Sequence, residues 1–462
     1  MTEISYMRIM KKLTVVVLML FCVLSGCNGR QDAEDEMLAA APPMGWNSWI
    51  CFGTSVTEDE VKANADYMSA NLREYGWEYV VIDAGWYAPG MVTLEQYESP
   101  CPEQLIDAYG RLVPDPEKYP SSAGGKGLAP LADYVHGIGL KIGLHIMRGI
   151  PVQAVEMDTP VKGTVYTARD IADINSRCDW YSGFYGIDMS RPGAQEYYDS
   201  IFELYESWGI DYIKADDMLS PVYASDEIGA VASAVSRMGR KVVISLSPGP
   251  APVENIADLR RSAQMWRISE DFWDSWDSLK EQFSLCRKWQ GYAVRGHWPD
   301  ADMLPVGPMA RRAMRGGPRP TNFTEAEQYT LMTLWAMFRS PLMIGCNLPE
   351  LDDFTLKLLT NGKVLEINQN SVCNKELFAR GDIIAWYAGS ANGESHYVAV
   401  FNTGDSDAED FCFALDEINF TGDAEITELW SGEEVNVKDR AISCGIDAHG
   451  VKLFEINLKD RK

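Results

Sequence analysis

The chain has 462 residues, of which 46% are hydrophobic and 11% aromatic, so it is long enough for one large domain and a smaller one with packed cores. Its formal net charge of −26 argues against nucleic acids and anionic membrane surfaces as partners, because like charges repel each other. A neutral substrate is compatible with this charge.

The N-terminal residues have the pattern of an export signal. A basic stretch precedes an apolar run over residues 13–24, which is too short for a stable membrane span. The run ends in Leu24-Ser25-Gly26-Cys27, which is similar to the lipobox of bacterial lipoproteins. We therefore expect residues 1–27 to be a signal peptide and Cys27 to be acylated. The alternative is a plain secretory signal that is cut nearby.

Residues 28–40 are mostly polar or small, and we expect them to form a flexible tether. With an acylated Cys27, the protein would be exported and lipid-anchored to the bacterial outer membrane, or it would face the periplasm or the cell surface. It would contact a membrane only through this anchor.

A unit of amphipathic helix, glycine and apolar strand recurs from about residue 41 onward. In the first copy, Thr57 and Glu60 form a capping box at the start of a helix that Gly76 ends. The apolar run over residues 79–82 then predicts a buried strand. This strand leads directly into Asp83, so a polar side chain lies at its C-terminal end.

Three more copies follow in the same order. Helices are predicted over residues 131–136, 194–208 and 228–238, and apolar strands over residues 141–144, 211–214 and 242–244. The strands lead into His145, Asp216 and Ser247. Alternating helices and short strands predict a parallel sheet. Polar residues after several strands favour a (β/α)8 TIM barrel over a doubly wound sheet, which would carry a glycine-rich phosphate loop after its first strand.

The pattern of helices and strands changes near residues 368–370. Short alternating apolar runs follow over residues 383–387, 397–401, 426–430 and 451–456. Asn392-Gly393 and Thr403-Gly404 have the composition of turns between such runs. We therefore expect the barrel to occupy residues 41–370 and a small antiparallel β-sandwich domain to occupy residues 371–462.

Charged side chains gather after the short apolar stretches of the expected barrel. The set consists of Asp83, Asp216, Asp271 and Asp302, with Lys214 and Arg267 among them. A single aspartate after a strand often caps the next helix. Several at one barrel mouth would repel each other unless cations or a hydroxyl-rich ligand offset them, and charges gathered at that cost indicate a functional site. Five scattered histidines and no CxxC pair form no metal-site pattern, so we expect neither a metal nor a cofactor.

These segments resemble glycoside hydrolase family 27, the α-galactosidase and α-N-acetylgalactosaminidase family. The resemblance lies in Pro42-Pro43-Met44-Gly45-Trp46-Asn47-Ser48-Trp49, Ile82-Asp83, Tyr212-Ile213-Lys214-Ala215-Asp216, Trp266-Arg267 with Asp271, Gly296-His297-Trp298-Pro299-Asp300-Ala301-Asp302-Met303-Leu304 and Val364-Leu365-Glu366-Ile367-Asn368-Gln369-Asn370. The segments occur in the family's order along the whole expected barrel. Their ordered set is therefore specific, although any one of them could arise by chance.

The resemblance implies a (β/α)8 barrel followed by an antiparallel β domain, and a carbohydrate substrate. It places the family nucleophile at Asp216 and the family acid/base at Asp271. Positions that line the sugar subsite in the family correspond to Trp49, Asp83, Lys214, Arg267 and Asp302. His145 stands where the family usually has a strand-end tyrosine, and we expect it to contact sugar as well.

The chemistry of glycoside cleavage is consistent with these roles. The transition state resembles a cation, which a carboxylate beneath the anomeric carbon stabilises. Lys214, on the same face of its strand as Asp216, would help to keep that carboxylate ionised. The acid partner must hold a proton, for which Glu270 and Asp274 could supply negative charge near Asp271. A retaining mechanism needs the two carboxyls about 5 Å apart, against roughly 6.5–9.5 Å for inversion.

The sequence departs from the family where the sugar is recognised. The family's pair of adjacent aspartates is Asp83-Ala84 here, so one hydrogen-bond acceptor is missing. Ser247 replaces a glutamate that reads the 2-hydroxyl group, and a small residue there resembles the N-acetylgalactosaminidase branch. Asp217 is either a replacement acceptor or an ordinary loop acid. These changes leave the identity of the sugar open.

We therefore expect an exo-acting retaining glycosidase that removes terminal α-galactosyl residues from oligo- or polysaccharides. The alternatives within the same chemistry are an α-N-acetylgalactosaminidase, a β-L-arabinopyranosidase and an α-glucosyl-specific relative. L-Arabinopyranose differs from galactose only in lacking the exocyclic carbon, which the Asp83-Ala84 region would help to read. A non-catalytic surface glycan-binding lipoprotein is a further alternative, but such a protein would be expected to lack one of the two carboxylates.

Overall fold

The computed structural model describes residues 37–90, 92–93 and 102–459. The predicted signal peptide, Cys27 and most of the predicted tether lie outside these residues. None of the helices within them combines the length and the apolar character needed to cross a membrane.

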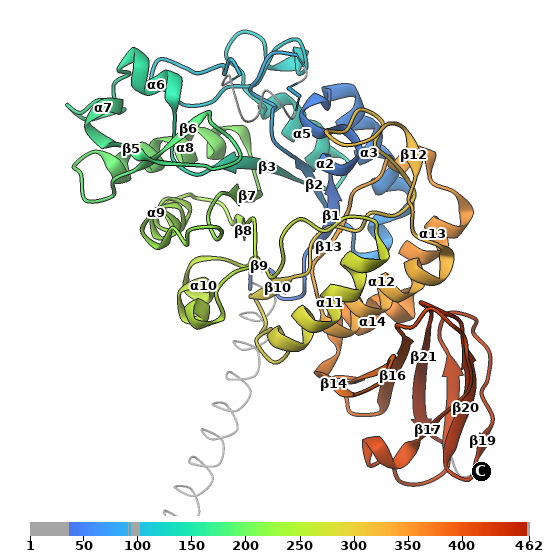
Figure 1. Ribbon diagram of the computed structural model, residues 1–462. Helices are drawn as coiled ribbons and strands as arrows, with labels where there is room; N and C mark the ends of the chain where they lie inside the picture. The colour runs from blue at the N-terminus through green and yellow to red at the C-terminus, as the bar shows by residue number, and fades with distance from the viewer. Residues whose placement is uncertain (1–36, 91, 94–101, 460–462) are drawn as a thin grey trace, which may run out of the picture.

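Eight parallel strands form the sheet at the centre of the large domain (Figure 1). They are β1 (Met44–Asn47), β2 (Tyr79–Ile82), β3 (Lys141–Met147), β7 (Tyr212–Asp216), β8 (Val243–Leu246), β9 (Met265–Arg267), β10 (Trp298–Asp300) and β13 (Leu342–Ile344). They pair in the order β13-β1-β2-β3-β7-β8-β9-β10. After β10, Leu304 forms a parallel bridge with Ile344 of β13 and closes the ring. The predicted (β/α)8 barrel is confirmed.

Helices surround the barrel (Figure 1). The longer ones are α3 (Glu58–Asn71), α5 (Ala129–Gly137), α8 (Ala194–Trp208), α9 (Ser225–Ser236), α10 (Ile256–Ser262), α11 (Trp276–Trp289), α12 (Glu325–Phe338), α13 (Asp353–Leu359) and α14 (Gly362–Asn370). The predicted capping box of α3 is confirmed, because the Glu60 carboxylate accepts from the Thr57 N–H at 3.0 Å and the Thr57 hydroxyl accepts from the Glu60 N–H at 3.4 Å. Short helix α2 (Trp49–Phe52) follows β1 directly.

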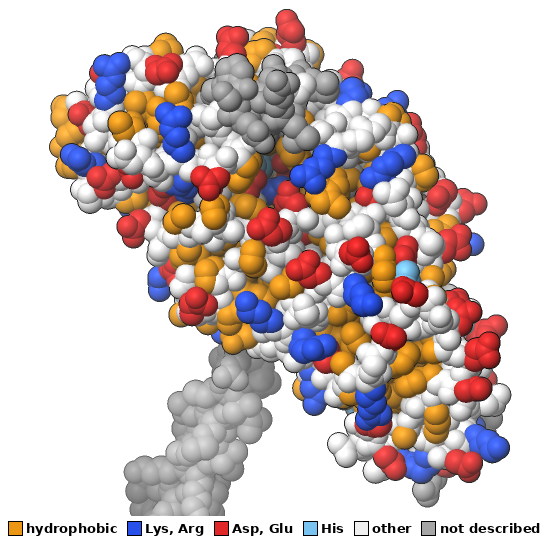
Figure 2. Space-filling model, in the orientation of Figure 1, with side chains coloured by type: hydrophobic (Ala, Val, Ile, Leu, Met, Phe, Trp, Pro, Cys, Tyr) orange, Lys and Arg blue, Asp and Glu red, His pale blue; other side chains and the backbone are white. Residues whose placement is uncertain are grey.

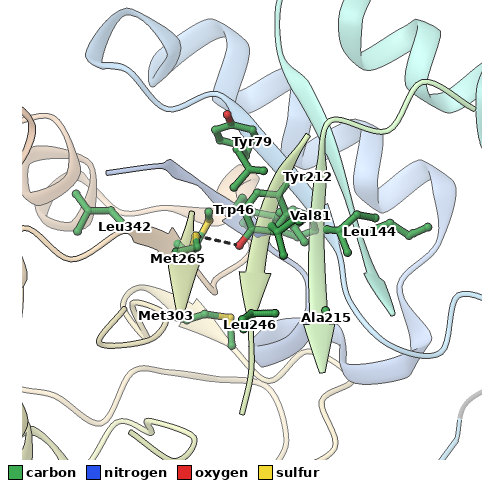
Figure 3. Close-up of a cluster of buried hydrophobic side chains, with 14 of the residues drawn as sticks. Trp46, Tyr79, Val81, Leu144, Tyr212, Ala215, Leu246, Met265, Met303 and Leu342 are labelled. Atoms are coloured by element: carbon green, nitrogen blue, oxygen red, sulfur yellow. Dashed lines mark hydrogen bonds between the residues drawn. The ribbon is translucent and has the colours of Figure 1, made fainter. Parts of the chain in front are cut away.

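Figure 3 shows a cluster of buried side chains from neighbouring strands, among them Trp46 of β1, Val81 of β2, Leu144 of β3 and Leu246 of β8. The Tyr212 hydroxyl donates to the Met265 sulfur at 3.5 Å within this cluster. Because side chains fill this part of the barrel, the fold confines its polar chemistry to the C-terminal ends of the strands.

Two excursions leave the barrel and were not predicted. After β3 the chain forms a three-stranded sheet of β4 (Ile150–Pro151), β6 (Phe184–Ile187) and β5 (Ala172–Arg177), with helices α6 (Val152–Met157) and α7 (Ala168–Ile171). After β10 it forms an antiparallel hairpin of β11 (Pro308–Met309) and β12 (Arg319–Pro320). Both consist of short or polar strands, which carry little periodic signal.

The C-terminal domain consists of two antiparallel sheets. One contains β14 (Val372–Arg380), β15 (Ile383–Gly389), β16 (Ser395–Asn402), β21 (Val451–Leu458) and β18 (Ala424–Glu428), and the other contains β17 (Ala408–Ala414), β20 (Ala441–Ile446) and β19 (Val437–Lys438). A cluster that includes Val398, Phe413, Ile442 and Phe454 is buried between them. The predicted β-sandwich is confirmed.

The sandwich packs directly against the barrel. Helix α12 contacts β14, β15, β16 and β21, and the Phe283 and Phe401 rings are 5.0 Å apart. The Trp430 indole N–H donates to the Thr333 hydroxyl at 2.9 Å. The His449 ring stacks on Trp276 with centroids 3.8 Å apart. On the face shown in Figure 2, acidic and basic side chains are interspersed over both domains.

Candidate active site

A cavity of about 430 Å³ opens at the C-terminal ends of the barrel strands. The structure brings most of the predicted site residues together in its wall: Trp49, Asp83, His145, Lys214, Asp216, Ser247, Arg267 and Asp271. Asp302 is not among the residues that line it. The cavity thus contains both carboxylates to which the family resemblance assigns catalytic roles.

Asp216 is the last residue of β7, and three groups bind its carboxylate. One oxygen accepts from the Ser247 hydroxyl at 2.9 Å and from the Asp217 backbone N–H at 3.1 Å, and the other lies 3.0 Å from the His145 Nε2. An ionised carboxylate only accepts, so the His145 Nε2 carries the proton of this bond. Burial alone would raise the pKa of Asp216, but the bond from His145, the nearby Lys214 charge and the Ser247 hydroxyl hold it well below its usual range. Asp216 is therefore ionised at neutral pH.

Lys214 and Asp83 form a buried ion pair beside Asp216. The ammonium nitrogen lies 2.7 Å from the Asp83 Oδ2, which also accepts from the Asn47 amide at 2.8 Å. Burial would lower the pKa of Lys214, but the charges of Asp83 and Asp216 raise it above its usual value. Lys214 thus carries a permanent positive charge between two carboxylates. This matches the predicted role of Lys214 in keeping the nucleophile candidate ionised.

Arg267 links Asp271 to Asp302. Its guanidinium lies 2.8 Å from an Asp302 oxygen and 3.3 Å from an Asp271 oxygen. Asp302 also accepts from the Phe272 N–H at 2.8 Å and is buried. Asp302 therefore helps to hold Arg267 in place. Asp302 thus influences the cavity by positioning Arg267, and its own carboxylate is not part of the cavity wall.

Asp271 stands at the mouth of the cavity. Its side chain is 56% exposed, against 14% for that of Asp216. Of the two acids predicted to surround it, Glu270 also lines the cavity. Asp274 instead forms a bidentate pair with Arg319, with one oxygen 2.9 Å from a guanidinium nitrogen. Its charge is therefore neutralised locally, and the prediction that Asp274 acts on Asp271 is not supported by this geometry.

Asp217 turns away from the cavity. Its carboxylate accepts from the Arg148 Nε at 2.9 Å, and Arg148 also donates to its carbonyl at 3.0 Å. Burial raises the pKa of Asp217 to about 6, against the lowering effect of Arg148. Of the two roles considered for Asp217, the structure favours the loop acid over the sugar contact.

Arg148 has a role in this loop that the sequence did not reveal. It also donates to Glu227 at 2.7 Å and to Ser176 at 3.0 Å, while its backbone N–H donates to the Asp216 carbonyl at 2.9 Å. It thereby joins β3, β7, α9 and the inserted sheet around Asp216. Its position three residues after His145 is the only sequence signal that could have indicated this.

Further residues of the cavity wall were also missed. Trp180, Trp273, Met303, Met314 and Arg315 line the same cavity and come from loops outside the predicted βα units. Of these residues, Trp273 is the one that the sequence could have indicated, because it lies two positions after Asp271. Among the described residues, no group of three or more histidine, cysteine or acidic side chains is arranged to hold a metal ion.

Two protein-family models match this chain, one over the barrel and one over the sandwich. The family model described as Alpha galactosidase A matches residues 41–155 and 181–370. The model described as Alpha galactosidase C-terminal beta sandwich domain matches residues 380–456. The chain belongs to the alpha-galactosidase family, glycoside hydrolase family 27. It is a glycoside hydrolase, and the resemblance seen in the sequence is confirmed.

Relatives within this family act on more than one sugar. A family 27 β-L-arabinopyranosidase from Geobacillus stearothermophilus is 43% identical, with a TM-score of 0.89 over 91% of this chain and 98% of its own. A Bacillus halodurans structure provisionally assigned as an α-N-acetylgalactosaminidase is 40% identical, with a TM-score of 0.82 over 92% and 100%. The α-galactosidase of Cyamopsis tetragonoloba is 27% identical over 92% of this chain and 89% of its own. This glycoside hydrolase is thus similar to enzymes of differing glycone preference.

Proposed function

We propose that this family 27 enzyme is an exo-acting retaining glycosidase that removes terminal α-galactosyl residues from oligo- or polysaccharides. The observation that carries the proposal is the unequal placement of two carboxyl groups in one cavity. Asp216 is ionised and held by His145 and Ser247 at the strand ends, whereas Asp271 is exposed at the mouth beside Arg267. A buried anion and an accessible acid are the two parts that double displacement requires.

In the first step, Asp216 attacks the anomeric carbon while Asp271 transfers its proton to the glycosidic oxygen, and the leaving group departs as an alcohol. The bond between sugar and aglycone breaks as the ester to Asp216 forms. In the second step, Asp271 takes a proton from water, the oxygen of which attacks the anomeric carbon and releases Asp216. The positive charge of Lys214 favours the carboxylate form of Asp216 at the start and at the end of this cycle.

A β-L-arabinopyranosidase is the second candidate, and Ala84 favours it. Ala84 lines the cavity and offers a methyl group where the family resemblance leads us to expect a carboxylate. A sugar without the exocyclic hydroxymethyl group loses nothing at such a position, whereas galactose loses a hydrogen-bond partner. The 43% identity to the Geobacillus stearothermophilus enzyme supports the same candidate.

Initial rates on a panel of 4-nitrophenyl glycosides test the proposal. The panel contains α-galactoside, α-N-acetylgalactosaminide, α-glucoside and β-L-arabinopyranoside, and NMR identifies the anomer that is released first. We expect α-galactose to be released with retention, and Asp216→Asn to abolish turnover because it removes the nucleophile while keeping its shape. Preference for the arabinopyranoside would select the second candidate. An inverted product, or substantial activity in Asp216→Asn, would reject the mechanism.

We also propose that the enzyme is exported and lipid-anchored through Cys27. The support is the sequence of the apolar run and Leu24-Ser25-Gly26-Cys27, which lie outside the described residues. Mass spectrometry of membrane-extracted protein is expected to find a diacyl or triacyl group on an N-terminal Cys27. A chain that starts at Met1, or a soluble form that is cut elsewhere, would reject this proposal.

A further inference from the structure

The outer part of the cavity contains side chains that the two-carboxylate reaction does not use. Trp180, Trp273 and Arg315 line the mouth and belong to three different loops. The acid in the proposed reaction must face the glycosidic oxygen, so the leaving group has to pass Asp271 on its way out. Trp273 is only two residues further along the chain. This side of the mouth therefore adjoins the leaving group and not the sugar that is cleaved off.

Arg315 is presented to the mouth by a loop that is held on both sides. The loop is the tip of the β11–β12 hairpin, residues 310–318. Arg312 donates to the Glu60 carboxylate, and the Met314 sulfur accepts from the Thr54 hydroxyl at 3.9 Å. At the far side, Arg319 forms its bidentate pair with Asp274. The position of Arg315 is thus fixed by neighbours that bind elsewhere.

The four arginines between residues 311 and 319 differ in one respect. Arg311, Arg312 and Arg319 are paired with Glu350, Glu60 and Asp274. For Arg315, no carboxylate of the described residues lies within ion-pairing distance, and its guanidinium lies over the Trp273 ring at 5.0 Å from the centroid. An arginine stacked on an indole keeps the N–H groups at its edge free for a planar, bidentate acceptor such as a carboxylate.

The inner cations cannot serve an anionic ligand in the same way. Lys214 is paired with Asp83, and Arg267 is paired with Asp302. The inner part of the cavity therefore suits a neutral sugar. Among the described residues of its wall, the lysine or arginine without a carboxylate partner is Arg315, at the mouth. The part of the cavity that binds the cleaved sugar therefore differs in charge from the part that adjoins the leaving group.

Trp180 supplies an apolar surface to the mouth. It comes from the inserted sheet region after β3, in the stretch between residues 155 and 181 that the family model leaves unmatched. Its ring stacks on Tyr181 with centroids 6.5 Å apart and an interplanar angle of 20°. Indole rings are suited to packing on the apolar face of a pyranose. This wall is thus a feature of the present chain that lies outside the family pattern.

We propose that Trp180, Trp273 and Arg315 form a leaving-group subsite for an acidic sugar, in which the indoles contact the pyranose ring and Arg315 binds its carboxylate. The subsite rests on the proposed function, since it takes the sugar that Asp271 protonates. It predicts a substrate whose terminal neutral sugar is linked to a uronic acid.

Two disaccharides with the same terminal sugar and linkage test this subsite. The terminal sugar is the one that the glycoside panel selects, and the second sugar is methyl glucoside in one disaccharide and methyl glucuronide in the other. The readout is the ratio of kcat/KM for the glucuronide to kcat/KM for the glucoside, so factors common to both cancel. We expect a ratio of about five in the wild type, as for an exposed charge-assisted contact, and a fall toward one in 0.5 M salt.

Arg315→Met is expected to lower this ratio to about one. Arg311→Met is the matched control, because Arg311 belongs to the same loop, pairs with Glu350 and does not line the cavity. A wild-type ratio of one or below, an unchanged ratio in Arg315→Met or an equal loss in Arg311→Met would overturn the proposal. If the 4-nitrophenyl glycosides are cleaved normally while the ratio is one, only the subsite is rejected. If none is cleaved, the proposed function and the subsite are both rejected.

Discussion

The imidazole Nε2 of His145 lies 3.0 Å from Oδ2 of Asp216, although 71 positions separate the two residues in the chain. Strands β3 and β7 are neighbours in the barrel, and their register pairs His145 with Lys214 and Met147 with Asp216. The His145 Nδ1 is buried and has no hydrogen-bond partner among the described residues. The bond to Asp216 is thus the principal polar contact of this ring, and the ring acts directly on the ionisation of the proposed nucleophile.

His145→Ala is expected to shift the acidic limb of the kcat/KM profile to higher pH. The bond from His145 lowers the pKa of Asp216, so its loss raises that pKa. The proposed nucleophile would then be protonated at a pH at which it is still ionised in the wild type. A hydrogen bond to a charged group is worth about 1.5–3 kcal/mol, which predicts a fall in kcat/KM of about 10- to 100-fold. His136→Ala is the control, because His136 pairs with Asp211 away from the cavity. An acidic limb that stays in place would contradict the assignment.

Arg148→Met is expected to lower kcat about tenfold or more while KM changes little. Arg148 donates to the Asp216 carbonyl and to the carbonyl and carboxylate of Asp217, and it lies outside the cavity wall. Its loss would therefore displace the proposed nucleophile without removing a sugar contact. Steady-state kinetics on the preferred nitrophenyl glycoside measure the two constants. Arg177→Met is the matched control, since Arg177 lies in the inserted sheet, where its guanidinium stacks over the Tyr185 ring and donates to the Tyr185 hydroxyl. A rise in KM at constant kcat would indicate a binding role instead.

Ala84→Asp is expected to raise the rate on α-galactosides relative to β-L-arabinopyranosides. The new carboxylate would accept a hydrogen bond from the exocyclic hydroxyl of galactose, which arabinopyranose lacks, and a charged bond of about 1.5–3 kcal/mol predicts a change of about tenfold or more in the ratio of kcat/KM values. Ala84→Val fills the same space without an acceptor and should move the ratio the other way. If both variants lower both rates equally, the residue does not read this part of the sugar.

Asp300 is expected to make the free energy of unfolding depend on pH. It is buried near Arg267, and burial raises its pKa from the ordinary 3.8 to about 7. Between these two values the folded protein holds a proton that the unfolded chain has released, so the free energy of unfolding falls as pH rises from about 4 to 7, by an amount on the order of a few kcal/mol. Thermal unfolding of Asp300→Asn should show a flatter dependence and a higher Tm than the wild type at pH 8. Asp133→Asn, an exposed change on α5, should leave the wild-type dependence intact, and a parallel decline in Asp300→Asn would contradict this prediction.

Local patterns in the sequence were sufficient to predict the barrel and the residues at the centre of the site. The predicted strand at residues 79–82 coincides with β2, because it is a continuous apolar run that is buried along its whole length. The predicted helix at residues 194–208 coincides with α8, which is amphipathic and ends at Gly209. Strands β3 and β7 extend further than predicted, to Met147 and Asp216, because pairing with neighbouring strands continues past the apolar run. Strand-end residues were found because the fold itself places the ends of parallel strands together.

The rim and the support of the site depend on contacts that no local pattern contains. Arg319 reaches Asp274 across 45 positions, and Arg148 reaches Glu227 across 79. Asp302 follows β10 as predicted, but its backbone takes a positive φ of 81° and its carboxylate turns to Arg267. Such pairings are decided by which loops meet in space. Composition and spacing could identify the acids but not the partner of each.

The stacking of His449 on Trp276 makes the sandwich part of the catalytic barrel's framework. Trp276 opens α11, and the segment just before it carries Asp271 and Trp273, so a residue of the C-terminal domain holds the end of the loop that bears the candidate acid. Truncation after Asn370 would expose Phe283 to water and leave Thr333 without its partner Trp430. The barrel is consequently unsuited to use as a stand-alone module in fusion enzymes, and domain exchange within the family would have to carry α11 and α12 along with the sandwich.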